Sequence, residues 1–89
     1  DTSNVTIMDM MFNYCEQLTN IPLFNTSKVT DVDRMFCYCH KVESGALALY
    51  QQVSSQTNPP TNHEETFYNC GIDTVNGAAE LAQIPSDWK

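Results

Sequence analysis

A stretch of eleven residues occurs twice in this chain, 24 positions apart. The first copy covers residues 5–15 and the second covers residues 29–39. They agree at Val5/Val29, Thr6/Thr30, Asp9/Asp33, Met11/Met35, Phe12/Phe36, Tyr14/Tyr38 and Cys15/Cys39. A shorter third copy, residues 67–70, keeps the Phe-x-x-Cys ending. A fixed period of this length is typical of proteins built from stacked repeats.

Within each repeat, the apolar spacing predicts a short helix followed by a short strand. Apolar residues of the first copy fall at steps of 3, 3, 1 and 3 from Val5 to Cys15, which places them on one helical face. Thr6 with Asp9, and Thr30 with Asp33, have the spacing of a capping box at the start of such a helix. We therefore expect the methionines of this face, Met11 and Met35, to fill the core.

The segment Leu18–Leu23 has the alternation of a strand. Ile21 and Leu23 are expected to point inward around Pro22. Because Pro22 cannot donate a backbone hydrogen bond, this strand must lie at an edge or place that nitrogen away from its neighbour.

The C-terminal half departs from the repeat. Residues 46–53 form a good helix by propensity, with Ser44 as a plausible N-cap. A second short helix is expected over residues 78–83. Because the last coil of a repeat stack needs a cover, we expect Trp88 to fold back against this cap; an exposed Trp88 acting as a binding anchor is the alternative.

Three of the four cysteines share one repeat position. Cys15, Cys39 and Cys70 each follow a Phe by three residues. This favours a column of small, buried, reduced side chains. A disulfide between neighbouring coils is the alternative, because such coils come close enough for one.

Composition and charge exclude several functions. The chain has 89 residues, enough for a single domain, and a formal net charge of −7 from 11 acidic and 4 basic side chains. This balance argues against nucleic acid as a partner, since that needs a basic footprint. No segment is apolar enough to insert directly into a membrane. The chain starts without Met on a repeat leader, so we expect a fragment whose signal and anchor lie elsewhere.

The residues give little support for chemistry. Cys37, Cys39, His40 and His63 lack the spacing of a structural zinc site. His63-Glu64-Glu65 lacks the second histidine of a zincin motif and fits a solvated helix start better. No nucleophile motif accompanies the serines and histidines. We therefore predict no enzyme activity, no cofactor and no metal.

The pattern Asp-Thr-Ser-x-Val-Thr, Met-Phe-x-x-Cys and Cys-x-x-Leu over residues 1–42 resembles the repeat of BspA-like bacterial surface proteins. The resemblance implies an α/β repeat fold: a short leucine-rich-repeat-like solenoid, with short strands on one face, short helices on the other and a helical C-terminal cap. In this interpretation residues 1–89 form one domain, with two leucine-rich-like repeats in 1–42 and a degenerate third repeat and cap in 43–89.

The same resemblance implies a function at the surface of a bacterium. Such proteins are secreted or held on the cell surface, some of them in gut anaerobes, and are associated with adhesion to host matrix proteins, glycans or other bacterial surface proteins. In organisms of that kind, Asp73-Thr74-Val75 would match an acceptor for O-linked sugars.

Two functional hypotheses follow. The first is a non-catalytic interaction module with contacts at the outward strand positions Thr19, Asn20 and Pro22, beside Phe24. The second is a purely structural cap, with the binding surface in upstream repeats.

Overall fold

The computed structural model describes residues 4–89 and contains two short helices. Helix α1 spans Ala46–Ser54, α2 spans Val75–Ala82, and a single 3-10 turn, η1, spans Ser86–Trp88. No strand forms in the described part of the chain. Isolated parallel bridges alone occur there, joining Ile7 to Asp31, Asn20 to Ser44 and Asp31 to Asn62. The prediction of an α/β leucine-rich-repeat-like solenoid, with strands on one face and helices on the other, is therefore wrong.

The two copies of the repeat form chains of tight turns in place of the predicted helices. In the first copy, the N–H groups of Met11, Asn13 and Cys15 each donate to the carbonyl three residues earlier, at 3.1–3.3 Å. The second copy repeats this pattern over residues 32–39. We call residues 8–15, 32–39 and 63–70 the first, second and third turn segments.

Left-handed backbone conformations at every fourth position explain why neither helix nor strand forms. They occur without glycine, at φ values of 52–63°, in all three turn segments: Met10, Tyr14, Arg34, Tyr38, Glu65 and Asn69. A residue at φ near +55° fits neither the helical nor the extended region, so each one ends any regular element.

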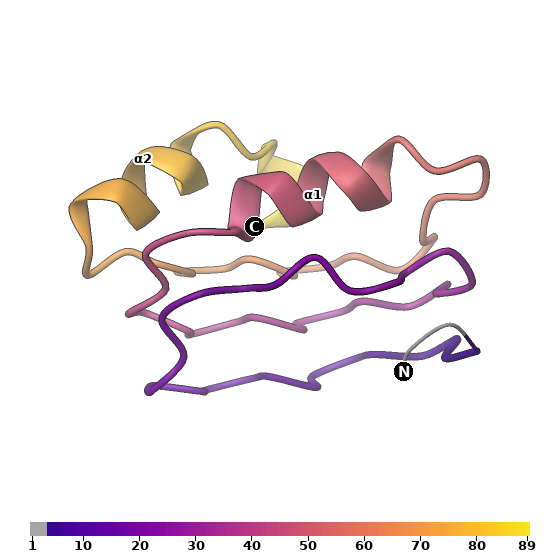
Figure 1. Ribbon diagram of the computed structural model, residues 1–89, viewed down its shortest axis with the longest axis horizontal. Helices are drawn as coiled ribbons and strands as arrows, with labels where there is room; N and C mark the ends of the chain where they lie inside the picture. Colours follow the sequence, from indigo (N-terminus) through magenta and orange to yellow (C-terminus); the bar gives the residue numbers. More distant parts are fainter. Residues whose placement is uncertain (1–3) are drawn as a thin grey trace.

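The turn segments lie one above another, joined by backbone hydrogen bonds from every second residue. Figure 1 shows the three levels, from indigo at the bottom to orange beneath the helices. Phe12 N donates to the Met35 carbonyl at 2.9 Å, and Phe36 N donates to the Thr66 carbonyl at 2.8 Å. The side chains follow the same register, since the ring of Phe36 stacks on Phe12 at 5.2 Å and on Phe67 at 5.8 Å.

The predicted capping boxes hold neighbouring levels together instead of starting helices. The Thr30 hydroxyl donates to the Thr6 carbonyl at 3.3 Å. The Asp33 carboxylate accepts a hydrogen bond from Glu64 N at 2.8 Å, so it links the second segment to the third. His63-Glu64-Glu65 likewise precedes turns and not a helix.

In the segment Leu18–Leu23, the inward placement predicted for Ile21 is confirmed and that predicted for Leu23 is wrong. Ile21 is buried and its N–H donates to the Ser44 carbonyl at 3.0 Å. Leu23 points outward and is 61% exposed. Phe24 N donates back to the Pro22 carbonyl at 3.2 Å, and this tight three-residue turn breaks the alternation that would have turned Leu23 inward.

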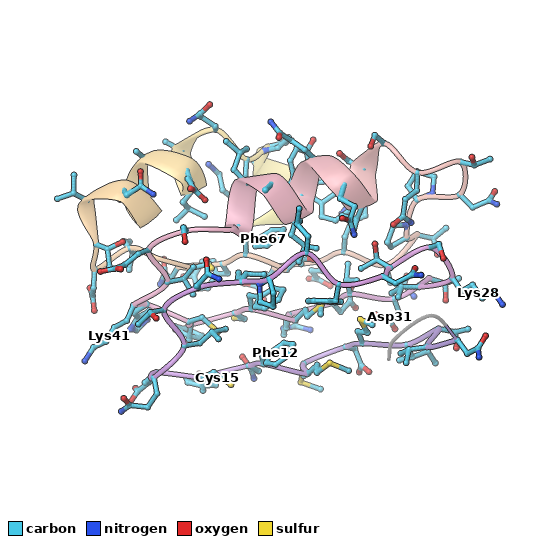
Figure 2. All side chains as sticks on the ribbon, in the orientation of Figure 1. Phe12, Cys15, Lys28, Asp31, Lys41 and Phe67 are labelled. Carbon is cyan, nitrogen blue, oxygen red and sulfur yellow. The ribbon has the colours of Figure 1, made fainter. Side chains whose placement is uncertain are left out.

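The core lies between the turn segments and the helices (Figure 2). Phe36, Phe67, Cys39 and Cys70 are buried, as the repeat alignment predicted. All four cysteines are free, and Cys15 is half-buried. Met35 is also buried, but the inward placement predicted for Met11 is wrong, because this side chain is 46% exposed.

Both predicted helices are present, with different caps. Gly45, not Ser44, precedes α1 at φ 101°, and an added Cβ there would lie 2.2 Å from the Ile21 carbonyl oxygen. The close approach of two backbones therefore requires glycine. Thr74 caps α2, since its hydroxyl accepts from Gly77 N at 2.9 Å.

The C-terminal turn closes the top of the stack. Trp88 is buried, and its indole stacks on the His63 ring at 4.1 Å and meets Tyr50 edge-on. Its carbonyl accepts from Phe67 N at 2.9 Å, so η1 lies against the third turn segment. The prediction that Trp88 folds back onto the cap is confirmed, and the alternative of an exposed anchor is wrong.

Candidate interaction site

The residues predicted to contact a partner lie at one rim of the fold. Thr19, Asn20 and Pro22 are exposed, whereas Phe24 is half-buried against the ring of Phe12 at 6.5 Å. Some polar groups of this rim already form hydrogen bonds within the chain. The Thr19 carbonyl accepts from Glu43 N at 2.7 Å, and the Asn20 amide oxygen accepts from the Ser44 hydroxyl at 2.5 Å.

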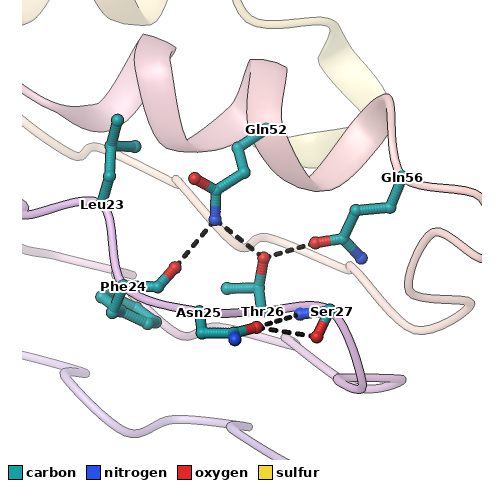
Figure 3. A pocket seen from close by; sticks show the side chains of 7 residues that line it. All are labelled: Leu23, Phe24, Asn25, Thr26, Ser27, Gln52 and Gln56. Atoms are coloured by element: carbon teal, nitrogen blue, oxygen red, sulfur yellow. Dashed lines mark hydrogen bonds between the residues drawn. The ribbon is translucent and has the colours of Figure 1, made fainter. Parts of the chain in front are cut away.

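A shallow groove runs beside Phe24, between residues 23–27 and the last turns of α1 (Figure 3). Gln52 reaches down from the helix and donates to the Phe24 carbonyl at 2.8 Å and to the Thr26 hydroxyl at 3.0 Å. That hydroxyl in turn donates to the Gln56 amide oxygen. These bonds fasten the C-terminal end of α1 and the residues that follow it to residues 24–26.

The groove offers few free groups to a ligand. Thr26 is buried, and the Asn25 side-chain oxygen accepts from both the N–H and the hydroxyl of Ser27, at 2.9 and 2.7 Å. Leu23 is the apolar side chain that the groove leaves open to solvent. The hydrogen bonds that line the groove therefore serve the fold, and its rim is apolar.

A second surface is formed by three tyrosines on successive turn segments, which we call the tyrosine ladder: Tyr14, Tyr38 and Tyr68. The first two rings stack at 4.6 Å with 14° between their planes, and the third meets the second edge-on at 5.3 Å. The ladder lies outside the main core cluster, and Tyr14 is 60% exposed. It is a continuous aromatic surface on the solvent side of the turn segments.

Charged and apolar groups border the ladder. Arg34 Nε lies 3.1 Å from a Glu65 oxygen, which ties the second segment to the third and limits the freedom of both side chains. Met10, 52% exposed, adds an apolar side chain at the repeat position equivalent to Arg34. Loss of hydration raises the pKa of the Tyr38 hydroxyl, with smaller contributions from Tyr68 and Tyr14. The Tyr38 hydroxyl is therefore neutral and able to donate a hydrogen bond at physiological pH.

The residues considered for metal chemistry are engaged in packing. The Cys39 thiol donates to the Phe12 carbonyl at 2.9 Å, and burial raises its pKa to about 11. His63 is stacked on Trp88, and its Nδ1 lies 3.0 Å from the Asp87 carbonyl oxygen. Across residues 4–89, no three His, Cys, Asp or Glu side chains come together in a way that could hold a metal ion.

Thr74, the centre of the expected sugar-acceptor motif, has a structural role. Its hydroxyl caps α2 and lies 3.1 Å from the Val42 carbonyl oxygen and 3.2 Å from that of Gly71. A sugar on this oxygen would replace the proton that these carbonyls share, so the fold disfavours the modification. Neither helix in the described part of the chain is long and apolar enough to cross a bilayer.

The sequence contained a signal for the tyrosine ladder that the predictions did not use. Tyr14 and Tyr38 are identical in the repeat alignment, like Phe12 and Phe36. The predicted helix left the direction of the tyrosines unresolved. In the turn segments, the Phe and Cys positions face the core cluster and the tyrosines lie outside it.

Comparison with known proteins gives a family but no function. No curated protein matches the chain. No solved structure matches it either. Residues 1–78, most of the chain, match a family of repeat-containing sequences. The match does not test the source, so a gut anaerobe stays a prediction. The chain belongs to the family described as "Mycoplasma protein of unknown function, DUF285".

Proposed function

We propose that this chain is a non-catalytic protein-interaction module of a bacterial cell-surface protein, with the tyrosine ladder as its contact surface. The observation that carries the proposal is the stack of the exposed Tyr14 ring on the half-buried Tyr38 ring, at 4.6 Å, with Met10 exposed four residues earlier in the same segment. Tyrosine and methionine are enriched at protein interfaces, and a stacked tyrosine loses little conformational freedom on binding.

Two further observations support this assignment. The family description names a bacterial group, and residues 1–42 resemble BspA-like surface repeats, which suggests adhesion at the cell surface. The net charge of −7 favours partners that are neutral or basic, such as host matrix proteins or other bacterial surface proteins. The predicted contacts Thr19, Asn20, Pro22 and Phe24 form a separate surface that the same experiment can compare.

The test is a binding screen of the folded chain against host matrix proteins, glycans and bacterial surface proteins, followed by two matched variants. Tyr14→Ala with Met10→Ala removes the exposed end of the ladder, and Thr19→Ala with Pro22→Ala removes the rim surface. We expect at least tenfold weaker binding for the first variant, since aromatic anchors often contribute about 2 kcal/mol, and little change for the second. The reverse order would move the site to the rim and refute the ladder.

A structural cap is the second candidate function, and the geometry of Trp88 favours it. The indole is buried, and η1 occupies the side of the third turn segment that would otherwise stay open. Deleting residues 84–89 should then produce soluble oligomers or aggregates, because an exposed row of backbone donors recruits other chains. A monomeric, folded truncation, seen by sedimentation and circular dichroism, would contradict the cap.

A further inference from the structure

The stack of turn segments has a direction, set by its backbone hydrogen bonds. N–H groups of the first segment donate to the second, from Met8, Met10, Phe12 and Tyr14 to the carbonyls of Asp31, Asp33, Met35 and Cys37. The second segment donates to the third in the same way, from Val32, Arg34, Phe36 and Tyr38 to Asn62, Glu64, Thr66 and Tyr68. Each segment therefore has a donor side toward the C-terminal end of the stack and an acceptor side toward the first segment.

The two ends of the stack differ accordingly. At the donor end, Phe67 N is bonded to the Trp88 carbonyl and the Trp88 indole lies on the His63 ring. At the acceptor end, no hydrogen-bond donor within residues 4–89 reaches the carbonyls of Ile7, Asp9, Met11 and Asn13. These four carbonyls occupy the same repeat positions as the four carbonyls of the second segment that accept hydrogen bonds from the first segment. We call them the open edge, which lies at the bottom of Figure 1.

Side chains at the open edge are exposed where their counterparts are buried. Met11 is 46% exposed and Met35 is 1% exposed. Cys15 is half-buried, whereas Cys39 is fully buried. The residue types are the same and the backbone conformation is the same, so the difference comes from the segment that covers one and not the other.

We propose that the open edge is a docking site for a further turn segment of the same repeat type, presenting its donor side. Such a segment would place an N–H group opposite each of the four carbonyls and a Phe ring on Phe12, continuing the Phe12–Phe36–Phe67 column by one level. The existing interface between the first and second segments is the template for this contact.

The same geometry disfavours the simplest other occupant, a second copy of this chain. Two open edges face each other with acceptors only, so no backbone hydrogen bond forms between them. A head-to-tail contact would need the donor side of the third segment, where η1 and the buried Trp88 already lie. The partner must therefore carry a donor side that is not covered, which is what an uncapped repeat has.

The experiment adds one repeat to the intact chain. A second copy of residues 1–24 is fused in front of residue 1, with Cys15→Ser in the added copy so that the original Cys15 is the reporter at this edge. The control fusion also carries Phe12→Asp in the added copy. Native-state alkylation of Cys15 and urea unfolding are then compared among the parent, the fusion and the control.

The proposal expects Cys15 in the fusion to react more slowly, on the order of tenfold, because the new segment covers it, while the control reacts like the parent. The fusion should unfold in one transition whose m value is larger by about a quarter, in proportion to the added surface. Equal Cys15 reactivity in parent and fusion would overturn the proposal. The parent should sediment as a monomer. A dimer in which Cys15 is protected would overturn the proposal, because it would show that two copies of the open edge can pair with each other.

Discussion

The middle ring of the phenylalanine column is the side chain whose loss should destabilise the fold most. Phe36 is 1% exposed and lies between Phe12 at 5.2 Å and Phe67 at 5.8 Å, with both pairs nearly parallel. A buried Phe→Ala change costs about 3–5 kcal/mol, and loss of two ring contacts places Phe36→Ala at the upper end, about 4–5 kcal/mol. A chain of 89 residues has a total stability of roughly 4–13 kcal/mol. The variant should therefore retain roughly 0–9 kcal/mol, and at the lower end of this range it would be unfolded.

The matched control is Phe12→Ala, at the equivalent position one level down. Phe12 is half-buried and stacks on a ring from one side only, with a tilted contact to Phe24. Its loss should cost about half as much, roughly 2 kcal/mol. Urea unfolding followed by far-ultraviolet circular dichroism measures the loss in free energy of unfolding for each variant, and we expect the same m value for both. Equal losses for the two variants would refute the claim that coverage by neighbouring segments sets the contribution of each ring.

Three further predictions concern titration, a close contact and backbone strain. Burial raises the pKa of Cys39 to about 11 and also raises that of Cys70, so stability should be constant below the ordinary thiol pKa near 9. Above that pH the free energy of unfolding should fall by up to ~1.4 kcal/mol per pH unit for each thiol, because the thiols of the unfolded state lose their protons first. Urea midpoints that do not change between pH 8 and pH 10.5 would contradict this prediction. Gly45→Ala should destabilise by about 2–4 kcal/mol in thermal unfolding, because its Cβ would meet the Ile21 carbonyl oxygen at φ 101°; an unchanged melting temperature would show that the two backbones can separate. Met10→Gly should stabilise by about 0.5–1 kcal/mol, because φ is 55° and the side chain is half exposed; a loss in urea unfolding would mean that Met10 packs more than its exposure indicates.

The repeat register was predictable from sequence, but the local conformation was not. Aligning the two copies placed Phe36 above Phe12 and Cys39 above Cys15, and the third copy placed Phe67 and Cys70 in the same columns. Identity at equal spacing is a strong signal because each level must fit the one before it. The predicted helix failed because a chain of four-residue turns also returns a side chain to the same face every third or fourth residue.

Glycine would have distinguished the two conformations, and it is absent from the critical positions. Met10, Tyr14, Arg34 and Tyr38 all have positive φ, a conformation that sequence patterns associate with Gly or Asn. Only Asn69, in the third segment, has a residue type that tolerates it well. Sequence reasoning therefore had no local marker for the turns, and the capping-box spacing of Thr and Asp favoured the wrong interpretation.

The C-terminal half was easier to predict because local propensity decided it. The two helices appeared within a few residues of their expected limits, whereas their caps depended on tertiary contacts. Gly45 precedes α1 because the Ile21 backbone lies against it, and Thr74 caps α2 while contacting Val42. The candidate site shows the same division: the tyrosines repeat visibly, but their exposure depends on which side of the turn segments faces the core.

The strain in the turn segments implies that their stability comes from stacking. A left-handed conformation costs a non-glycine residue about 1–2 kcal/mol, and each segment contains two such residues. No single segment can offset this cost by itself, because its own turns contribute few hydrogen bonds. The second segment is covered on both sides, by backbone bonds and by the rings of Phe12 and Phe67. The first is covered on one side, so its strain is the least compensated, and a further repeat on its open edge would supply what the second segment already has.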